Sequence, residues 1–294
     1  MRKRDFLAAG LGLGAGMAVS SMLQPAFAQA PAATPAGGGR GRNISSRNAT
    51  TTKLFKAPGA YPNALAIAPE GLWIGQQKNA ALQQSSGSMS EAAWLVDWNG
   101  KLLKTLQTNS RNTSGMAYGD NCVWMGANAA PNGIFQVDMS GKELSHRQIP
   151  MSLNDQGGGC HGLQWHDGKL WIAALRLGGA LRVDPKTWTP EILIPIQSPE
   201  KPRLHDITFD DNGDMWIITG TNSTGPADAH AGLSKYDGKT GQLLMTADLE
   251  PGSCDPHGLV WHDGKLVSCD AGIHPGWPDN ASTTSGWIFS IDLT

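Results

Sequence analysis

The sequence of 294 residues is poor in cysteine and in charge, and it has no long apolar run after its first 28 residues. Its four cysteines include no CxxC pair, which argues against a cysteine-based zinc site. Because no later stretch approaches 18 consecutive apolar residues, no membrane-spanning helix is expected. Residues 53–294 hold 17 Lys and Arg against 24 Asp and Glu. This acidic balance argues against a nucleic-acid partner.

The N-terminal part has the composition of an export signal followed by a flexible linker. A basic start over residues 2–4 precedes a short apolar run, and the small residues of 26–28 offer a cleavage site. We therefore expect residues 1–28 to be an export signal that resembles a twin-arginine signal, with an ordinary secretory signal as the alternative. Residues 29–52 have almost no large apolar side chain, so they are expected to be a disordered linker. The protein is then periplasmic or secreted.

One phrase occurs five times along the rest of the chain. Each copy has an apolar strand, a tight turn rich in Gly, Asp or Asn, and a second strand with a large apolar residue. The copies start at Pro62, Thr113, Cys160, Leu204 and Pro256. Their aligned apolar residues are Trp73, Trp124, Trp171, Trp216 and Val267. A period of about 40–50 residues with short strands is typical of β-propeller blades.

Each repeat continues into two further strands, which gives the four strands of one blade. The last repeat is one strand short, and the segment that starts at Thr51 can supply it. The sequence therefore predicts an all-β fold, a single β-propeller of five four-stranded blades over residues 53–294, closed by the N-terminal strand. The aligned Trp residues are expected to pack blade against blade.

The strand directions place the long loops 77–92, 219–231 and 271–285 on one face, and scaffold loops of this kind often carry function. The second residue of each innermost strand lies on the same face, beside the central channel. The residues at this position are Asn63, Ser114, His161, His205 and His257.

The three histidines could each bind the backbone of a neighbouring blade, but three of them around one channel favour a divalent metal site. We expect Asp255 and Asp270 to add carboxylate ligands or to orient an imidazole.

Further polar residues could contact a substrate at the channel mouth: Asn63, Ser114, Asn128, Arg176, Asp206, Asn222 and His274. A disulfide between Cys254 and Cys269 is also plausible, because both belong to one blade.

The phrase His-Gly-aliphatic followed by Asp-Gly-x-x-Trp resembles the repeat of streptogramin lyase-type propellers and of the neighbouring gluconolactonase-like propellers. By this resemblance, Asp255 and Asp270 would hold Mg²⁺, with Asp where the lyases have Glu. The resemblance also implies that His257 abstracts a proton, that His205 is a second catalytic histidine, and that an ester C–O bond breaks by elimination. The lyases have seven blades, whereas this sequence shows five.

The function expected from the sequence is that of an exported, metal-dependent lyase or hydrolase that acts on an ester or lactone. The metal could be Mg, Zn, Mn or Fe, with His257 as general base. One alternative is a redox metal on His161, His205 and His257. The other is a non-catalytic module that binds a small molecule or a protein, which imidazoles bonded to backbone carbonyls would favour. A monomer is expected.

Overall fold

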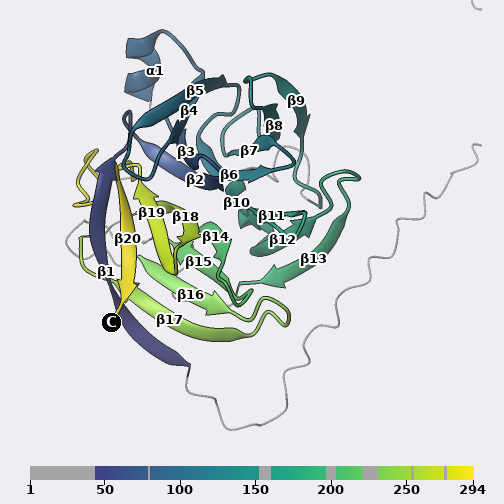
Figure 1. The fold of residues 1–294 in the computed structure, drawn as a ribbon, viewed down its shortest axis with the longest axis vertical. Coiled ribbons are helices and arrows are strands. Elements are labelled where there is room, and N and C mark those ends of the chain that lie inside the picture. Colours follow the sequence, from purple (N-terminus) through teal and green to yellow (C-terminus); the bar gives the residue numbers. More distant parts are fainter. Residues whose placement is uncertain are drawn as a thin grey trace, which may run out of the picture. The chain divides into compact units, whose positions relative to one another are not determined.

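The computed structural model describes residues 44–78, 80–151, 160–196, 203–220, 231–252, 255–274 and 277–294. Within these residues the chain is nearly all β, and its antiparallel strands form groups of four around a common centre (Figure 1). The export signal and most of the expected linker lie outside the described residues, as do Asn222 and Cys254. Among the described residues no helix is long and apolar enough to cross a membrane.

The blades share one order, from the innermost strand outward. Blade 1 contains β2 (Pro62–Ala68), β3 (Gly71–Gln76), β4 (Glu91–Val96) and β5 (Leu102–Thr108). Blade 2 contains β6 (Thr113–Gly119), β7 (Cys122–Ala127), β8 (Gly133–Asp138) and β9 (Glu143–Arg147). Blade 3 contains β10 (Cys160–His166), β11 (Lys169–Ala174), β12 (Gly179–Val183) and β13 (Pro190–Pro195). Blade 4 contains β14 (Leu204–Phe209), β15 (Met215–Thr219), β16 (Gly232–Tyr236) and β17 (Leu243–Leu249). Blade 5 contains β18 (Pro256–His262), β19 (Lys265–Asp270), β20 (Trp287–Leu293) and β1 (Ser45–Lys56).

The predicted five-bladed propeller is confirmed in its strand order. All five innermost strands begin at the residues that start the sequence repeats, and each inner strand contacts the next one around the ring. Two short helices interrupt the loops, α1 (Ala80–Ser86) between β3 and β4 and the 3₁₀ helix η1 (Leu175–Leu177) after β11.

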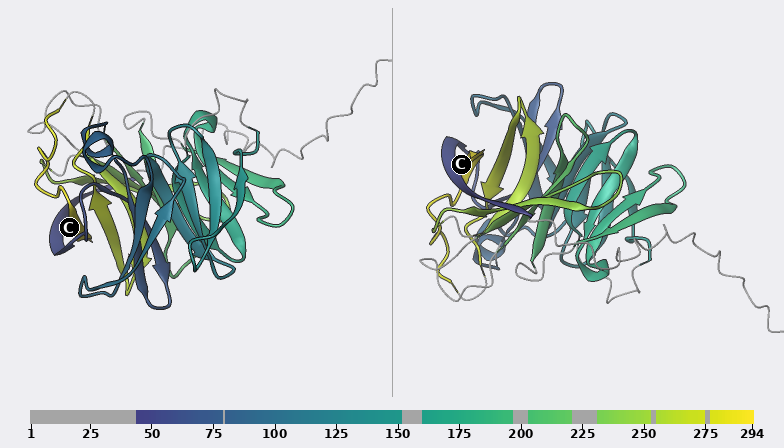
Figure 2. Two further views of the ribbon diagram at one scale, coloured as in Figure 1. Left: turned by 90° about the horizontal axis from the view of Figure 1, so that it is seen from above. Right: turned by 90° about the horizontal axis from the view of Figure 1, so that it is seen from below.

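Strand β1 closes the ring, as expected, but it does more than complete blade 5. It pairs antiparallel with β20 and, through its first residues, parallel with β17, so blades 4 and 5 form one eight-stranded sheet. In both views of Figure 2, β1 (purple) runs beside β20 (yellow). Glu250 fixes the crossing point, because its Oε1 accepts hydrogen bonds from the Thr51 amide (2.7 Å) and hydroxyl (2.5 Å).

The strand begins at Ser45, inside the segment expected to be a disordered linker. The physical reason is that β17 and β20 both present an unpaired edge, which an extended chain can cover with backbone hydrogen bonds. Residues 50–52 are three consecutive threonines, whose branched side chains favour an extended backbone.

The hydrophobic core is divided into five clusters, one between each pair of neighbouring blades. Trp73 packs with Met116 and Met125 of blade 2, for example, and Trp216 packs with Leu259 and Leu266 of blade 5. Four Trp residues and Val267 are buried at the aligned position. The expectation that these side chains join the blades is therefore confirmed.

Replacing Trp73 by Ala should lower the free energy of unfolding by about 3–5 kcal/mol, because it leaves a large cavity between blades 1 and 2. Trp73 is 0% exposed. Urea unfolding followed by circular dichroism measures the change. Leu102→Ala is the control, since Leu102 is 47% exposed and should change stability by less than about 0.5 kcal/mol. Equal effects of the two changes would contradict the packing described here.

Asp210 links the turn of blade 4 to its core tryptophan. Its Oδ2 accepts hydrogen bonds from Trp216 Nε1 (3.0 Å) and from Lys235 Nζ (2.8 Å). Its Oδ1 accepts from the amides of Asn212 (2.9 Å) and Asp214 (3.1 Å). Burial acts to raise the pKa of Asp210, but these hydrogen bonds outweigh it and hold the pKa below its usual value. The ionised carboxylate therefore stabilises the fold.

Because the pKa of Asp210 is lower in the folded state, its stabilisation is present above the unfolded pKa of about 4 and is lost as the pH falls further. Asp210→Asn should lower the free energy of unfolding by about 1–3 kcal/mol at pH 7. The difference from the unchanged protein should shrink below about pH 4. Asp292→Asn is the control, because Asp292 is a 43% exposed partner of Lys265. A gap that widens in acid would contradict this assignment.

Candidate metal centre

The three channel histidines owe their direction to a β-bulge that recurs in every blade. The pairing between the first and second strands shifts register at the second residue of each innermost strand. The residues at this shift are Asn63, Ser114, His161, His205 and His257, with Gly258 included in the shift of blade 5. A bulge turns a side chain away from the regular alternation of a strand. It explains why residues from separate blades meet at one place.

The residue after the bulge is small because the inner strands approach closely there. A Cβ atom on Gly162 would lie 2.6 Å from the Cα of Asp206, and one on Gly258 would lie 2.8 Å from the backbone nitrogen of Leu65. The His-Gly dipeptide therefore has two functions. The histidine side chain faces the channel region, and the glycine lets the neighbouring backbone come near.

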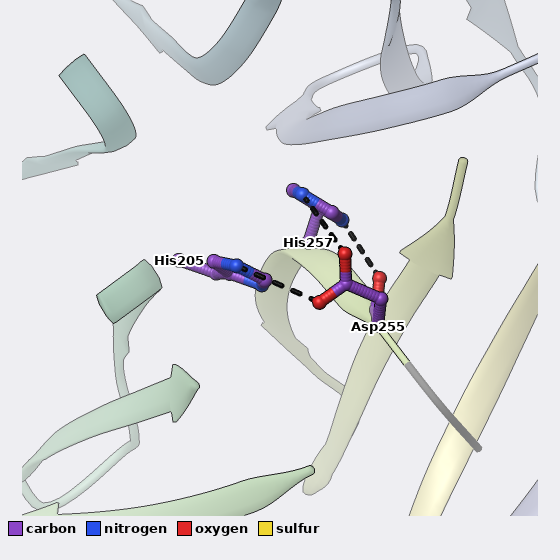
Figure 3. A group of neighbouring side chains, drawn as sticks. All are labelled: His205, Asp255 and His257. Atoms are coloured by element: carbon purple, nitrogen blue, oxygen red, sulfur yellow. Dashed lines mark hydrogen bonds and ion pairs between the residues drawn. The ribbon is translucent and has the colours of Figure 1, made fainter. Parts of the chain in front are cut away.

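The imidazoles of His205 and His257 form the centre of the site, and both are buried. Their rings stack with centroids 4.0 Å apart and planes inclined by 12°. Asp255 lies beside both rings (Figure 3), with Oδ1 3.7 Å from Nε2 of His205 and Oδ2 3.8 Å from Nε2 of His257. One ligand atom from each residue lies within 4.8 Å of the others.

Backbone carbonyls fix the tautomer of both imidazoles. The Nδ1–H of His205 donates to the carbonyl of Pro256, and the Nδ1–H of His257 donates to the carbonyl of Asp255, each at 2.7 Å. The Nε2 atoms then carry a lone pair, as in most metal-bound histidines, whose other nitrogen is held by an acceptor. Hydrogen bonds to backbone carbonyls on their own favour a structural role for a histidine. Here they engage only Nδ1, so that Nε2, the nitrogen nearest Asp255, can still bind a metal.

Burial favours the uncharged forms of His205, His257 and Asp255, so these residues do not form ion pairs with one another. Desolvation lowers the pKa of His257 to about 3 and places the pKa of His205 well below its usual value, with further lowering by nearby cationic groups. Desolvation raises the pKa of Asp255 well above its usual value, although the Arg203 guanidinium opposes this shift. Among the described residues, the buried His205 Nε2 and Asp255 Oδ2 have no hydrogen-bond partner. Buried acceptors that face one another without a donor are unfavourable unless a proton or a cation lies between them.

Gly220, which follows β15, packs its backbone closely against two of these acceptors. A Cβ atom on this residue would collide with the ring of His205 and with Oδ1 of Asp255, and would lie 2.7 Å from Nε2 of His205. The Gly220 amide donates to the carbonyl of Arg203 (2.8 Å), which holds the backbone in this place. A larger residue here would displace the His205 ring or the Asp255 carboxylate.

Asp270 is near the site and is held by hydrogen bonds within the protein. Its Oδ1 accepts from the amide of Gly272 (2.6 Å) and its Oδ2 from the hydroxyl of Thr284 (2.7 Å). A bond from the Asp255 backbone also reaches it. These bonds fix Asp255 and the loop after β19, and the expected role of Asp270 as a metal ligand stays a prediction.

His161 lies at the edge of the group rather than within it. Its ring centroid is 5.4 Å from that of His205 and 6.5 Å from that of His257. Nδ2 of Asn128 lies 2.6 Å from His161 Nε2, and burial lowers the pKa of His161 to about 4. Asn128 therefore orients an imidazole, and a direct contact with substrate is not needed to explain its position.

Three of the expected substrate contacts are buried and bonded within the protein. In blade 2, the carbonyl of Thr113 (2.9 Å) and Ser114 Oγ (3.1 Å) accept hydrogen bonds from Asn63 Nδ2. Asp206 accepts from the amides of Ile207 and Leu259, each at 2.8 Å, and from the backbone of Leu163. The hydrogen bonds of these residues join the inner strands, and their expected contact with a substrate stays a prediction.

The remaining expected residues are more exposed. Arg176 is exposed on η1, and the half-buried His274 stacks on Trp277 with ring centroids 3.8 Å apart. His274, Trp277, Asp255 and Asp270 share the wall of a cavity of about 10 Å³, which is room for a single water molecule. The thiol of Cys269 is buried and free. Its expected disulfide partner is Cys254, which the structure leaves undescribed.

Sequence analysis missed two residues of the site, Arg203 and Gly220. Nη1 of Arg203 lies 3.3 Å from Oδ1 of Asp255. The position of Arg203, two residues before His205, could have indicated a place at the same rim. Nothing in the sequence around Gly220 distinguishes it from a turn glycine, because its importance comes from a contact across blades.

Comparisons with known proteins support the fold. No protein-family model and no curated protein matches this chain. Glutaminyl cyclase from Myxococcus xanthus has a similar structure, with a TM-score of 0.54 and 10% identity over 85% of this chain and 98% of that one. The WD40 repeats of RRP9 give 0.49 and 11%, covering 79% of each chain. A luciferin-regenerating enzyme gives 0.45 and 13%, covering 79% of this chain and 76% of that one.

The chain has a β-propeller fold. At 10% identity the similarity to the glutaminyl cyclase extends to the fold alone. Of the expected resemblance to streptogramin lyase-type and gluconolactonase-like propellers, the part that is supported is the propeller fold.

Replacing Asp206 by Asn should lower the free energy of unfolding by about 1–3 kcal/mol, because the new amide group would face a backbone N–H donor. Asp211→Asn, in the exposed turn of the same blade, is the matched control and should change stability by less than about 0.5 kcal/mol. Chemical unfolding of both variants measures the difference. If Asp206→Asn were as stable as the control, the carboxylate would have another role than joining the inner strands.

Proposed function

We propose that this protein is an exported, metal-dependent enzyme whose cation is held by His205, His257 and Asp255 at the mouth of the propeller. The observation that carries the proposal is the convergence of buried acceptors on one another without a donor between them. Two imidazoles and one carboxylate are a common ligand set of catalytic metal sites, which leave further coordination positions open.

The donor set favours a transition metal over magnesium. Imidazole nitrogens suit Zn²⁺, Mn²⁺, Fe²⁺ or Ni²⁺, whereas Mg²⁺ takes oxygen ligands and keeps several waters. The Mg²⁺ that the lyase resemblance implies would rely on the carboxylates of Asp255 and Asp270, whereas the group described here offers two imidazole nitrogens and one carboxylate. We therefore infer a site for zinc, manganese or iron.

The substrate class that we propose is an ester or a lactone. A bound cation would supply a Lewis acid that polarises the substrate carbonyl. His205 and His257 hold their protons on Nδ1 and offer Nε2 as ligands, so neither is available as general base. His161 is the remaining imidazole at the channel, and Asn128 orients it. Elimination and hydrolysis both begin with a polarised carbonyl, and the proposal covers both.

A redox enzyme is the second candidate, and the composition of the ligand set favours it. Two histidines and one carboxylate with open positions are the ligands of many non-haem iron oxygenases. Here the carboxylate is Asp255, in place of the third histidine expected from the sequence. Oxygen consumption by the iron-loaded protein would support this candidate over the Lewis-acid one.

The cellular setting belongs to the same proposal. An export signal over residues 1–28 would deliver the protein to the periplasm, and a twin-arginine route would carry it already folded. Folding before export lets a metal be bound in the compartment where the chain is made. We expect a monomer that acts on a small molecule and binds no nucleic acid.

The test is metal content after dialysis against zinc, manganese or iron(II), measured by mass spectrometry of the elements. The unchanged protein should retain about one equivalent, and His205→Ala/His257→Ala should retain none, since removal of two ligands leaves only Asp255. His262→Ala is the matched control, because His262 stacks on Trp98 with centroids 3.5 Å apart and is no ligand. Hydrolysis or elimination of a panel of esters and lactones should depend on the retained metal.

Gly220→Ala tests the same site without removing a ligand. The added methyl group would collide with His205 and Asp255 and displace their side chains, which should abolish metal retention. Circular dichroism checks that the variant is folded. Asp255→Asn, which keeps the size of the side chain, should weaken retention at least tenfold. A protein that binds no metal under any of these conditions would overturn the proposal and favour the non-catalytic binding module.

A further inference from the structure

A second cavity lies between the outer parts of blades 1 and 2, and none of its lining residues belongs to the candidate metal centre. Its volume is about 340 Å³, which is within the range of small-molecule sites. The residues that matter here are Met89, Thr108, Arg111, Pro131, Phe135 and Glu143.

The cavity presents one positive and one negative side chain. Among the described residues no ion pair joins Arg111 to Glu143, so the two charges face the cavity separately. Oε2 of Glu143 accepts a hydrogen bond from Nδ2 of Asn109 (2.9 Å), which spans the two blades. A carboxylate accepts several hydrogen bonds, so Glu143 can also receive one from a ligand.

The rest of the lining combines exposed apolar side chains with groups that the protein already covers. Met89 is 42% exposed, and Pro131 is exposed as well. The ring of Phe135 is buried and stacks on His146 with centroids 4.1 Å apart, and the Thr108 hydroxyl is buried too. The apolar surface that the cavity offers to a ligand is therefore that of Met89 and Pro131.

The walls are held in place before any ligand arrives. The buried Glu91 accepts hydrogen bonds from the amides of Asn112 and Thr113, each at 2.9 Å, and so fixes the segment that carries Arg111. The carbonyl of Arg111 accepts from the amide of Ala129 (3.2 Å), which ties this segment to the loop that carries Pro131. A site that needs little ordering loses less affinity on binding.

We propose that this cavity binds a free α-amino acid with an apolar side chain. The ligand's carboxylate binds the Arg111 guanidinium, and its ammonium group binds Glu143. Its side chain packs against Met89 and Pro131. This site is independent of the metal centre and of the proposed enzymatic function.

The test is equilibrium dialysis of the full chain with labelled L-phenylalanine, and we expect one equivalent bound with a dissociation constant on the order of 1 mM or below. Arg111→Gln should weaken binding about tenfold or more, because it removes a charge-assisted hydrogen bond. Glu143→Gln should weaken binding of L-phenylalanine and leave that of 3-phenylpropanoate, which lacks the ammonium group, unchanged or stronger.

Lys186→Gln is the charge-matched control, since Lys186 is exposed in a turn of blade 3, and it should leave binding unchanged. Glu143 is exposed, so its variant tests the site even if Arg111→Gln fails to fold. No binding of L-phenylalanine at about 10 mM, or binding that survives both Arg111→Gln and Glu143→Gln, overturns the proposal.

Discussion

The close approach of the five innermost strands is the constraint on which the rest of the structure depends. Around the ring, the residue after each bulge is Gly or Ala except in blade 4, where Asp206 uses its carboxylate to bind the strands on both sides. Because the backbones approach so closely, the bulge directs the side chain of the second residue of each innermost strand toward the axis. The packing of the blades therefore sets this position, and the residue type at the position differs from blade to blade.

The candidate centre combines neutral imidazoles with one buried carboxyl group. The imidazoles of His205 and His257 hold their protons at Nδ1, where each donates to a backbone carbonyl. Moving a carboxylate out of water is costly unless a partner compensates for it. Arg203 compensates at Oδ1 of Asp255, whereas Oδ2 has no hydrogen-bond partner among the described residues, and this oxygen is the one that the proposed cation would compensate.

Much of this fold could be predicted from the sequence, because a propeller repeats its hydrophobic pattern once per blade. The positions of Trp73 and its equivalents gave the blade number, and the starts of the inner strands followed from the same alignment. The reach of β1 could not be predicted, since it depends on two strand edges that meet only in the folded chain. The spacing of the repeats also predicted that His205, His257 and Asp255 lie at one rim of the propeller.

The partners of a buried carboxylate are set by three-dimensional contacts, and this is why the aspartates were harder to assign. Asp206 was expected to contact a substrate and Asp270 to bind a metal, and the sequence could not show that their oxygens also accept hydrogen bonds from backbone amides and, for Asp270, from Thr284. Gly220 was missed for the same reason, because its role is the absence of an atom next to residues from two other strands.

Strand β1 has a consequence for the proposed metal site. His205 comes from blade 4, and His257 and Asp255 come from blade 5 and the segment before it, so the proposed ligands lie on both sides of one blade interface. β1 joins these two blades at their outer edge by pairing with both β17 and β20. We expect this pairing to resist separation of the two blades, so that the sheet, more than the flexibility of the ligands, would limit the radius of the ion that the proposed site accepts.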